Sequence, residues 1–384
     1  MRKQSGNAPH GSCVCRGIPF DVRRVALACD KPVTLPFGDL KAPWLVFLHT
    51  TDREEQEPNR DGFFSASRGE MQLGAHVADY VFIFADGSEV RTPIRSRFEI
   101  GMYWRHWGEH CFEALTHRKP HALATLTDQP RENAPWGWTQ TRVSQPDLDA
   151  WMYWVWAWEN PHPDKLLASL RIEPASGKTI IAGISSGAVG SNPLRWEMRE
   201  KAVLTLPKGK GFEPFVDERG FSKHVSIDLG QIICLERRKI YPDKTWARSS
   251  AGQPPEASET ELLVEYTAHP EAQFYFEGGR TMPVSNCTVT GKGRVTAVPP
   301  SRQRVRMRVV ERDSKKAVAV RLHIHGQAGE YLAPADRHRI PNPHWFEDYS
   351  AEYVGEGGHV STYISGETLI DLPVGQVYVE ISKG

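Results

Sequence analysis

The stretch that decides the fold runs from residue 151 to residue 158 and reads WMYWVWAW. Successive side chains of an extended strand point to opposite faces of a sheet. The alternation therefore sorts these residues into two sets, with Met152, Trp154, Trp156 and Trp158 on one face and Trp151, Tyr153, Val155 and Ala157 on the other. Both sets are large and apolar. Each face must be covered by other parts of the protein, or one of them must bind a ligand.

Short β-branched and aromatic segments continue on both sides of this stretch, punctuated by the chain's 32 Gly and 28 Pro. Long runs with the 3.6-residue apolar spacing of a helix are missing, which is typical of all-β proteins. The one short helix that the pattern favours spans residues 109–118. We predict an all-β fold of tandem β-sandwich domains with little helix.

Changes in composition divide the 384 residues into domains. The Ser/Gly-rich run 185–193 and the run Val298-Pro299-Pro300 have the character of linkers. We expect a disordered N-terminus at 1–15, a β-domain at 16–190, a middle β-domain at 191–300 and a small β-sandwich at 301–384. In the last domain, Arg304, Arg306 and Arg308 alternate with apolar residues, as in a strand with one solvated face.

Composition excludes several classes of protein. The 40% hydrophobic and 24% charged residues are those of a globular chain rather than a disordered one. Lys+Arg and Asp+Glu both number 47, so no net charge attracts the molecule to nucleic acid or to a membrane surface. No apolar run is long enough for a membrane helix, and residues 1–15 lack the apolar core of a signal peptide. We expect a cytoplasmic protein without nucleic-acid or membrane partners.

Eight of the twelve tryptophans fall within residues 104–158. Indole rings at these positions could fill a core, or they could stack on the apolar face of a sugar ring. Four of them lie in loop-like surroundings rich in Gly, Pro and charge, and these are our candidate carbohydrate-binding residues: Trp104, Trp107, Trp136 and Trp138.

A group of polar residues beside these tryptophans raises the possibility of catalysis. Arg105, His106, Glu109 and His110 combine a possible general base, a carboxylate and a cation. A polysaccharide lyase or glycoside hydrolase acting on an acidic glycan could use such a set. The sequence itself shows no geometry, so the alternative of a solvated loop stays open.

The pair His323 and His325 would share one face of a strand. Three further histidines, His338, His344 and His359, could complete a metal site with them. We interpret these residues instead as solvated or hydrogen-bonded histidines. The sequence therefore predicts no bound metal and no cofactor.

Two segments resemble known families. Residues 317–384, with Gly329-Glu330-Tyr331, Pro334, Asn342, Trp345, Gly366-Glu367 and Leu372-Pro373-Val374-Gly375, resemble the carboxypeptidase-regulatory-like, transthyretin-like sandwich that precedes the catalytic domain of PHP-type or amidohydrolase-like metallohydrolases. Residues 16–165, with Arg16-Gly17-Ile18-Pro19-Phe20, Ala85-Asp86-Gly87 and Trp158-Glu159-Asn160-Pro161-His162-Pro163-Asp164-Lys165, are similar to a galactose-binding-like jelly roll, in which a structural calcium ion is possible. These resemblances imply a jelly roll at 16–190 and an immunoglobulin-like or transthyretin-like sandwich at 301–384. The resemblance implies a non-catalytic region whose hydrolase domain would follow residue 384, so no metal ligand of that family can be placed on this chain.

These observations lead to one hypothesis and two alternatives. We expect a non-catalytic, carbohydrate-binding accessory or scaffold protein, or a fragment of a larger hydrolase, with a carbohydrate ligand and a hydrolase domain or partner chain as partners. The first alternative is a carbohydrate-active enzyme with its centre at residues 105–110. The second is a purely structural or oligomerising unit whose tryptophans all lie in the core.

Overall fold

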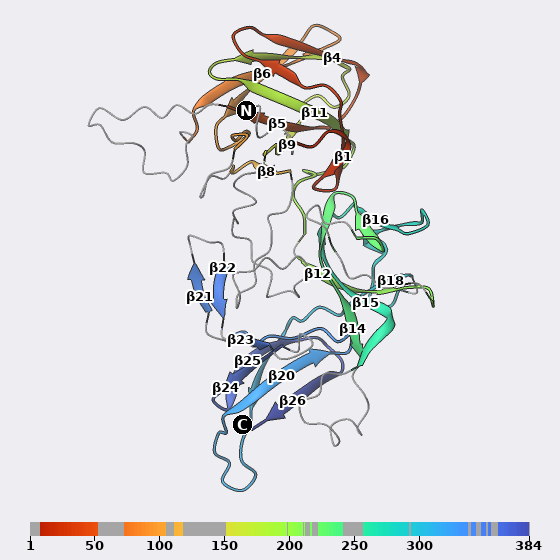
Figure 1. Ribbon diagram of the computed structural model, residues 1–384, viewed down its shortest axis with the longest axis vertical. Coiled ribbons are helices and arrows are strands. Elements are labelled where there is room, and N and C mark those ends of the chain that lie inside the picture. Colours follow the sequence, from red (N-terminus) through yellow and green to blue (C-terminus); the bar gives the residue numbers. More distant parts are fainter. Residues whose placement is uncertain are drawn as a thin grey trace, which may run out of the picture.

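The computed structural model describes residues 8–52, 73–104, 111–117, 151–197, 199–209, 211, 216, 222–240, 256–291, 293–336, 339–342, 347–350, 352–354 and 360–383. These segments form three β units that follow one another along the long axis of the molecule (Figure 1). They contain no α-helix and one 3-10 turn, Val284–Asn286. None of the described elements is a helix of the length and apolarity needed to cross a membrane. The prediction of an all-β fold is confirmed.

The first unit contains two sheets packed face to face and an N-terminal hairpin. One sheet has the strand order β4-β10-β6-β7, the other β3-β11-β5-β9-β8, and β1 pairs with β2. The strands are β1 Gly11–Cys15, β2 Ile18–Val22, β3 Ala26–Ala28, β4 Val33–Leu40, β5 Trp44–Thr51, β6 His76–Phe84, β7 Glu89–Arg95, β8 Ala114–Thr116, β9 Trp154–Glu159, β10 Leu167–Pro174 and β11 Thr179–Gly187.

The tryptophan-rich strand β9 is buried on both faces. Trp154, Trp156 and Trp158 lie in the core between the two sheets. There Trp158 stacks on Phe82, with the ring centroids 3.5 Å apart. The opposite face of β9 packs into a second cluster, which includes Ile18 and Phe20 of the β1–β2 hairpin. Of the two alternatives for this strand, the structure shows coverage of both faces, and the hairpin supplies part of the second cover.

Two local expectations for this unit are wrong. Residues 11–15, expected to be disordered, form β1 because they pair with β2 and place Cys15 in the core. The helix expected at 109–118 is replaced within the described residues 111–117 by the short strand β8. Backbone pairing of β8 with β9 overrides the apolar spacing that favoured a helix.

The middle and last units each enclose a core of their own. In the middle unit the sheet β14-β15-β12-β18 packs on β13-β16-β17. In the last unit β23-β24-β20-β26 packs on β19-β25, and β21 pairs with β22. The strands are β12 Glu200–Thr205, β13 Val225–Ile227, β14 Gly230–Ile240, β15 Glu256–Ala268, β16 Gln273–Phe276, β17 Thr281–Pro283, β18 Val295–Ala297, β19 Gln303–Arg308, β20 Val320–Gly326, β21 Arg339–Asn342, β22 Glu347–Ser350, β23 Glu352–Val354, β24 Val360–Ile364, β25 Glu367–Leu372 and β26 Val377–Ser382.

The first and middle units meet at the tip of the N-terminal hairpin. Arg16 donates hydrogen bonds to the backbone and hydroxyl oxygens of Thr116, and its third donor reaches Gln231 of β14 at 3.1 Å. The next residue, Gly17, has a φ of 73° and accepts a hydrogen bond from the Leu229 N–H. A Cβ at Gly17 would lie 2.5 Å from the Leu229 nitrogen, so only glycine allows this approach.

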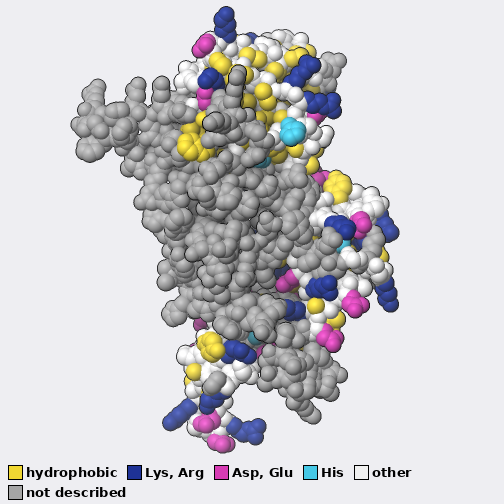
Figure 2. Space-filling model, in the orientation of Figure 1, with side chains coloured by type: hydrophobic (Ala, Val, Ile, Leu, Met, Phe, Trp, Pro, Cys, Tyr) yellow, Lys and Arg dark blue, Asp and Glu magenta, His cyan; other side chains and the backbone are white. Residues whose placement is uncertain are grey.

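The described surface mixes charges of both signs. Figure 2 shows basic and acidic side chains interspersed over the described part of this face, with no large area of one sign. This distribution agrees with equal numbers of basic and acidic residues in the sequence.

Candidate metal centre

Three potential metal ligands meet on one face of the last unit. β20 carries His323 and His325, which are two positions apart and therefore point to the same side of the sheet. The neighbouring strand β26 places Glu380 opposite His323 in the antiparallel register. The His323 Nε2 and Glu380 Oε1 atoms are 3.8 Å apart. Ligand atoms of all three side chains lie within 4.8 Å of one another.

Packing fixes the strand that carries the two histidines. Leu322 and Ile324 alternate with them and lie in the core of the last unit. On the other face His323 is 4% exposed and His325 is fully buried. Of the two environments expected for these histidines, solvation does not apply to His323 and His325, and a hydrogen bond is present at His325.

A hydrogen bond selects the tautomer of His325. Its Nδ1 lies 3.1 Å from the Gly326 carbonyl oxygen, which can only accept, so Nδ1 carries the proton. Nε2 then bears the lone pair that a metal ion needs. Histidine ligands commonly donate their second ring N–H to a carbonyl in this way, which fixes the orientation of the ring.

Two tyrosine rings hold the imidazoles in place. Tyr331 stacks on His323 with ring centroids 5.4 Å apart and an interplanar angle of 24°. Tyr378 stacks on His325 at 4.8 Å and 9°. Because neither imidazole can turn without disturbing a packed ring, an ion would meet ligands that are already oriented.

The distances between the ligand atoms of the three side chains would suit a small divalent ion if these side chains moved slightly closer together. Ligand atoms bound to tetrahedral zinc at about 2.1 Å lie roughly 3.4 Å from one another. The 3.8 Å between His323 Nε2 and Glu380 Oε1 is close to that value. The largest separation among the three ligand atoms is at most 4.8 Å, so side-chain movements of about 1 Å would be enough. Glu380 is the most exposed of the three ligands, because its side chain is 24% exposed on the edge strand β26.

Most residues chosen from the sequence lie outside the described ranges. This applies to Trp107, Trp136 and Trp138, to Arg105, His106, Glu109 and His110, and to His338, His344 and His359. Trp104 is described: it is half-buried, forms a backbone bridge with Trp151 and packs against the outer cluster of the first unit. The carbohydrate-binding and catalytic roles of these residues stay predictions.

A serine and a histidine in contact at the start of the middle unit resemble a hydrolase dyad. The Ser191 Oγ and His269 Nε2 atoms are 2.6 Å apart. However, His269 Nδ1 accepts the backbone N–H of Glu271 at 3.1 Å, so in neutral His269 the proton is on Nε2. That nitrogen donates to Ser191 and cannot accept its proton, so the pair fastens the linker rather than activating a nucleophile.

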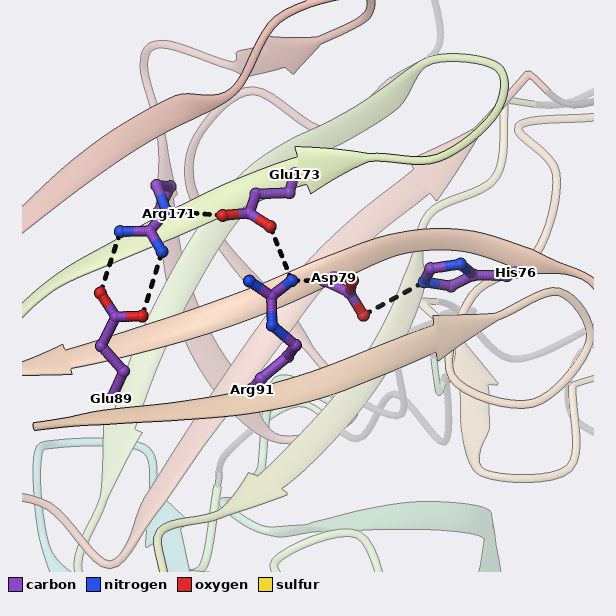
Figure 3. A network of polar contacts seen from close by, with 6 residues as sticks. All are labelled: His76, Asp79, Glu89, Arg91, Arg171 and Glu173. Atoms are coloured by element: carbon purple, nitrogen blue, oxygen red, sulfur yellow. Dashed lines mark hydrogen bonds and ion pairs between the residues drawn. The ribbon is translucent and has the colours of Figure 1, made fainter.

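In the polar network on the outer face of the first unit, the basic and acidic side chains pair with one another (Figure 3). Arg91 donates to Asp79 and Glu173, and Arg171 donates to Glu173 and Glu89. The two guanidinium groups hold the pKa of Glu173 below its usual range. Since each carboxylate already has a cation, this exposed ladder across β6, β7 and β10 offers no vacant charge to a ligand.

A buried carboxyl group beside the candidate centre affects stability rather than binding. Glu330 is 2% exposed, and burial raises the pKa of its carboxyl group, opposed by nearby backbone N–H groups and by Lys201 and Arg238. An acid whose pKa is raised on folding gives stability below its ordinary pKa, and this stability is lost as pH rises through the folded value. The neutral form is thus the one that the fold prefers.

We therefore expect Glu330→Gln to raise the free energy of unfolding at pH 7 by on the order of 1 kcal/mol. The gain should shrink toward pH 4, where the wild-type carboxyl group is also neutral. Urea unfolding at the two pH values measures both effects. Glu256→Gln, at an exposed position of β15, should leave stability unchanged. A loss of stability in Glu330→Gln at pH 7 would contradict the assignment.

Comparison with protein-family models, curated proteins and solved structures finds no match for this chain. The resemblance to the sandwich domains of metallohydrolases and to galactose-binding-like jelly rolls therefore stays a prediction. The function has to be argued from the geometry alone.

Proposed function

We propose that the last unit binds a divalent transition-metal ion, with zinc as the best fit, through His323, His325 and Glu380. The observation that carries this proposal is the placement of His323 opposite Glu380, beside a second buried histidine on the same face. Imidazole nitrogen is a good ligand for zinc, whereas calcium and magnesium prefer oxygen. Two imidazoles and one carboxylate therefore favour zinc over the oxygen-seeking ions.

The burial of the site supports ion binding rather than turnover of a large substrate. Three protein ligands leave one coordination position of a tetrahedral ion for water or another group. With both histidines buried and covered by tyrosine rings, Glu380 is the most exposed of the three ligands. We infer a modular, non-catalytic β protein whose ion stabilises the last unit.

Titration with Zn²⁺ at pH 7.5, followed by calorimetry and by competition with a chromogenic chelator, tests the proposal. Wild-type protein should bind one equivalent at this site, and Co²⁺ should give the visible absorption bands of a tetrahedral complex. His323→Ala, His325→Ala and Glu380→Gln should each weaken binding by at least ~100-fold, since even the loss of an outer hydrogen-bond partner costs 10–100-fold. Binding should also weaken as pH falls, because protons compete for the imidazole nitrogens.

His76→Ala provides the matched control, because His76 is an exposed histidine on β6 of the first unit. This variant should bind Zn²⁺ like the wild type. Saturating Zn²⁺ should raise the unfolding midpoint of the wild type and of His76→Ala, but not of the ligand variants. Zinc binding of undiminished affinity in a protein with all three ligand substitutions would refute the site.

A further inference from the structure

The strand β26 lies at the edge of its sheet and exposes apolar side chains. It pairs with β20, and no other strand in the described part of the chain pairs with it (Figure 1). In this register Val379 lies opposite Ile324, and Ile381 lies opposite Leu322. Residues directly opposite one another point to the same face of a sheet. Val379 and Ile381 therefore lie on the face that carries the core of the last unit.

The cover of this core ends between the two strands. Leu322 and Ile324 of β20 are 1% and 2% exposed, whereas Val379 and Ile381 of β26 are 44% and 49% exposed. The sheet that contains β26 has four strands, and the sheet packed against it, β19-β25, has two. Because the narrower sheet covers only part of the wider one, the apolar side of β26 stays open.

Most other edge strands of the described residues are protected against pairing with another chain. Proteins usually protect an edge by shortening it, or by placing Pro, charges or a bulge in it. Here β4 and β7 contain Pro36 and Pro93, β14 has register irregularities, and β19 carries three arginines. The strands β3, β8, β13, β17, β18 and β23 are three residues long.

β26 has none of these protections on its apolar side. It is six residues long, contains no Pro, and pairs with β20 without a register shift. Its one charged residue, Glu380, lies opposite His323 and so points to the histidine face, away from Val379 and Ile381. A regular apolar edge of this length is suited to the addition of another strand.

The sequence of β26 is complementary to itself. In an antiparallel pair centred on Val379, that residue lies opposite Val379 of the second copy, Val377 lies opposite Ile381, and Tyr378 lies opposite Glu380. Each apolar residue of the open side thus meets another apolar residue, and the carboxylate meets an uncharged tyrosine. A pair centred on Glu380 would instead place two carboxylates opposite each other, which is destabilising.

We propose that β26 is a self-association site, at which two copies of this chain join their β26 strands in antiparallel order about a two-fold axis at Val379. The two four-stranded sheets then become one continuous sheet. Such a contact is isologous, because the same residues are used on both copies. Two paired strands form a small interface, so the dimer is reversible and depends on concentration. The inference does not rest on zinc binding.

Sedimentation velocity in the presence of a chelator tests the proposal, because the chelator excludes association through a shared ion. Over an approximately 100-fold rise in concentration, the wild type should pass from one copy toward two by mass action. Val379→Lys places two ammonium groups opposite each other at the axis and should weaken association by at least ~100-fold. A wild type that stays monomeric, or a dimer that Val379→Lys leaves unchanged, would overturn the inference.

Leu27→Lys is the matched control. Leu27 is 48% exposed on β3, an edge strand of the first unit, so this change also places a lysine on an exposed apolar edge. It should associate like the wild type. Equal loss of the dimer in Leu27→Lys and Val379→Lys would mean that general surface apolarity, and not β26, controls association, contrary to the proposal.

A mixture of two variants separates loss of contact from loss of folding. Val379→Lys and Val379→Glu should each be monomeric, while an equimolar mixture should form a mixed dimer because opposite charges then meet at the axis. Unfolded variants could not regain a dimer on mixing. If both variants show the circular dichroism of the wild type and still do not combine, Val379 does not face its own copy and the proposal fails.

Hydrogen exchange of the unmodified protein locates the contact. The backbone amides of β26 should exchange several-fold more slowly at high concentration than at low concentration, while those of the edge strand β7 should exchange equally. A dimer in which the β26 amides show no added protection would place the interface elsewhere and overturn the inference.

Discussion

Acidification from pH 7 to pH 4.5 should lower the free energy of unfolding of the first unit by on the order of 2–3 kcal/mol through one residue, His49. His49 is fully buried in β5, where its two ring nitrogens lie 2.8 Å from the Tyr80 hydroxyl and from the Glu99 carbonyl oxygen. Burial lowers the pKa of His49 from 6.5 to about 3, partly opposed by the bond to Glu99.

The direction of the effect follows from where the proton is bound. Between pH 6.5 and pH 3 the unfolded chain takes up a proton on His49 that the folded protein excludes. The stability linked to this group is therefore complete well above pH 6.5, and between the two pKa values it is lost at about 1.4 kcal/mol per pH unit as pH falls. Tryptophan fluorescence during urea unfolding reports on this unit, because six tryptophans pack in its two clusters: Trp44, Trp104, Trp151, Trp154, Trp156 and Trp158.

Two variants separate the proton from the packing. His49→Gln keeps a donor and an acceptor but cannot be protonated. Between pH 6 and pH 4 its free energy of unfolding should therefore fall less steeply than that of the wild type, with a slope smaller by about 1.4 kcal/mol per pH unit. Tyr80→Phe removes the hydroxyl partner of His49 and should cost about 1–3 kcal/mol at pH 7 while retaining the wild-type slope. Equal slopes in His49→Gln and the wild type would show that another group controls the acid response.

Gly101→Ala should destabilise the first unit by about 3 kcal/mol or more. A Cβ at this position would lie 2.3 Å from the Trp154 ring, which is 2% exposed in the core. The ring cannot withdraw, because its Nε1–H donates to the Met102 carbonyl oxygen at 2.9 Å. Overpacking and loss of this buried hydrogen bond would act together.

The urea midpoint and the near-ultraviolet circular dichroism of the tryptophans measure this effect. Gly187→Ala is a suitable control, because the added Cβ would meet the Trp44 side chain at an ordinary 3.6 Å. It should change stability by less than about 0.5 kcal/mol. Wild-type stability in Gly101→Ala would mean that Trp154 has room to move, contrary to the packing described.

The parts of the fold that depend on local pattern could be predicted from the sequence. Alternation at residues 151–158 is sufficient to assign a strand with two buried faces, because the side-chain period of a strand does not depend on its partners. The Asp86-Gly87 pair joins β6 to β7, with Gly87 at a φ of 81°. Alternating arginines in β19 pair with Asp371 and Glu367 on the solvated face.

The parts that depend on register could not be predicted. The pair of histidines is visible in the sequence, but Glu380 becomes a candidate ligand only through the pairing of β20 with β26. Nothing in the local pattern of β26 distinguishes Glu380 from a solvated glutamate. Likewise, β1 and β8 are too short to show a period, and both exist because a neighbouring strand pairs with them.

The contact of Arg16 with Gln231 sets an order of events during synthesis. The two residues are 215 positions apart, so the tip of the first hairpin has no partner in the middle unit until more than half of the polypeptide has left the ribosome. Domains generally fold as they emerge. The first unit therefore folds before the tip of its β1–β2 hairpin can make this contact with the middle unit. A nascent chain halted before residue 231 would carry a finished first unit that lacks its anchor.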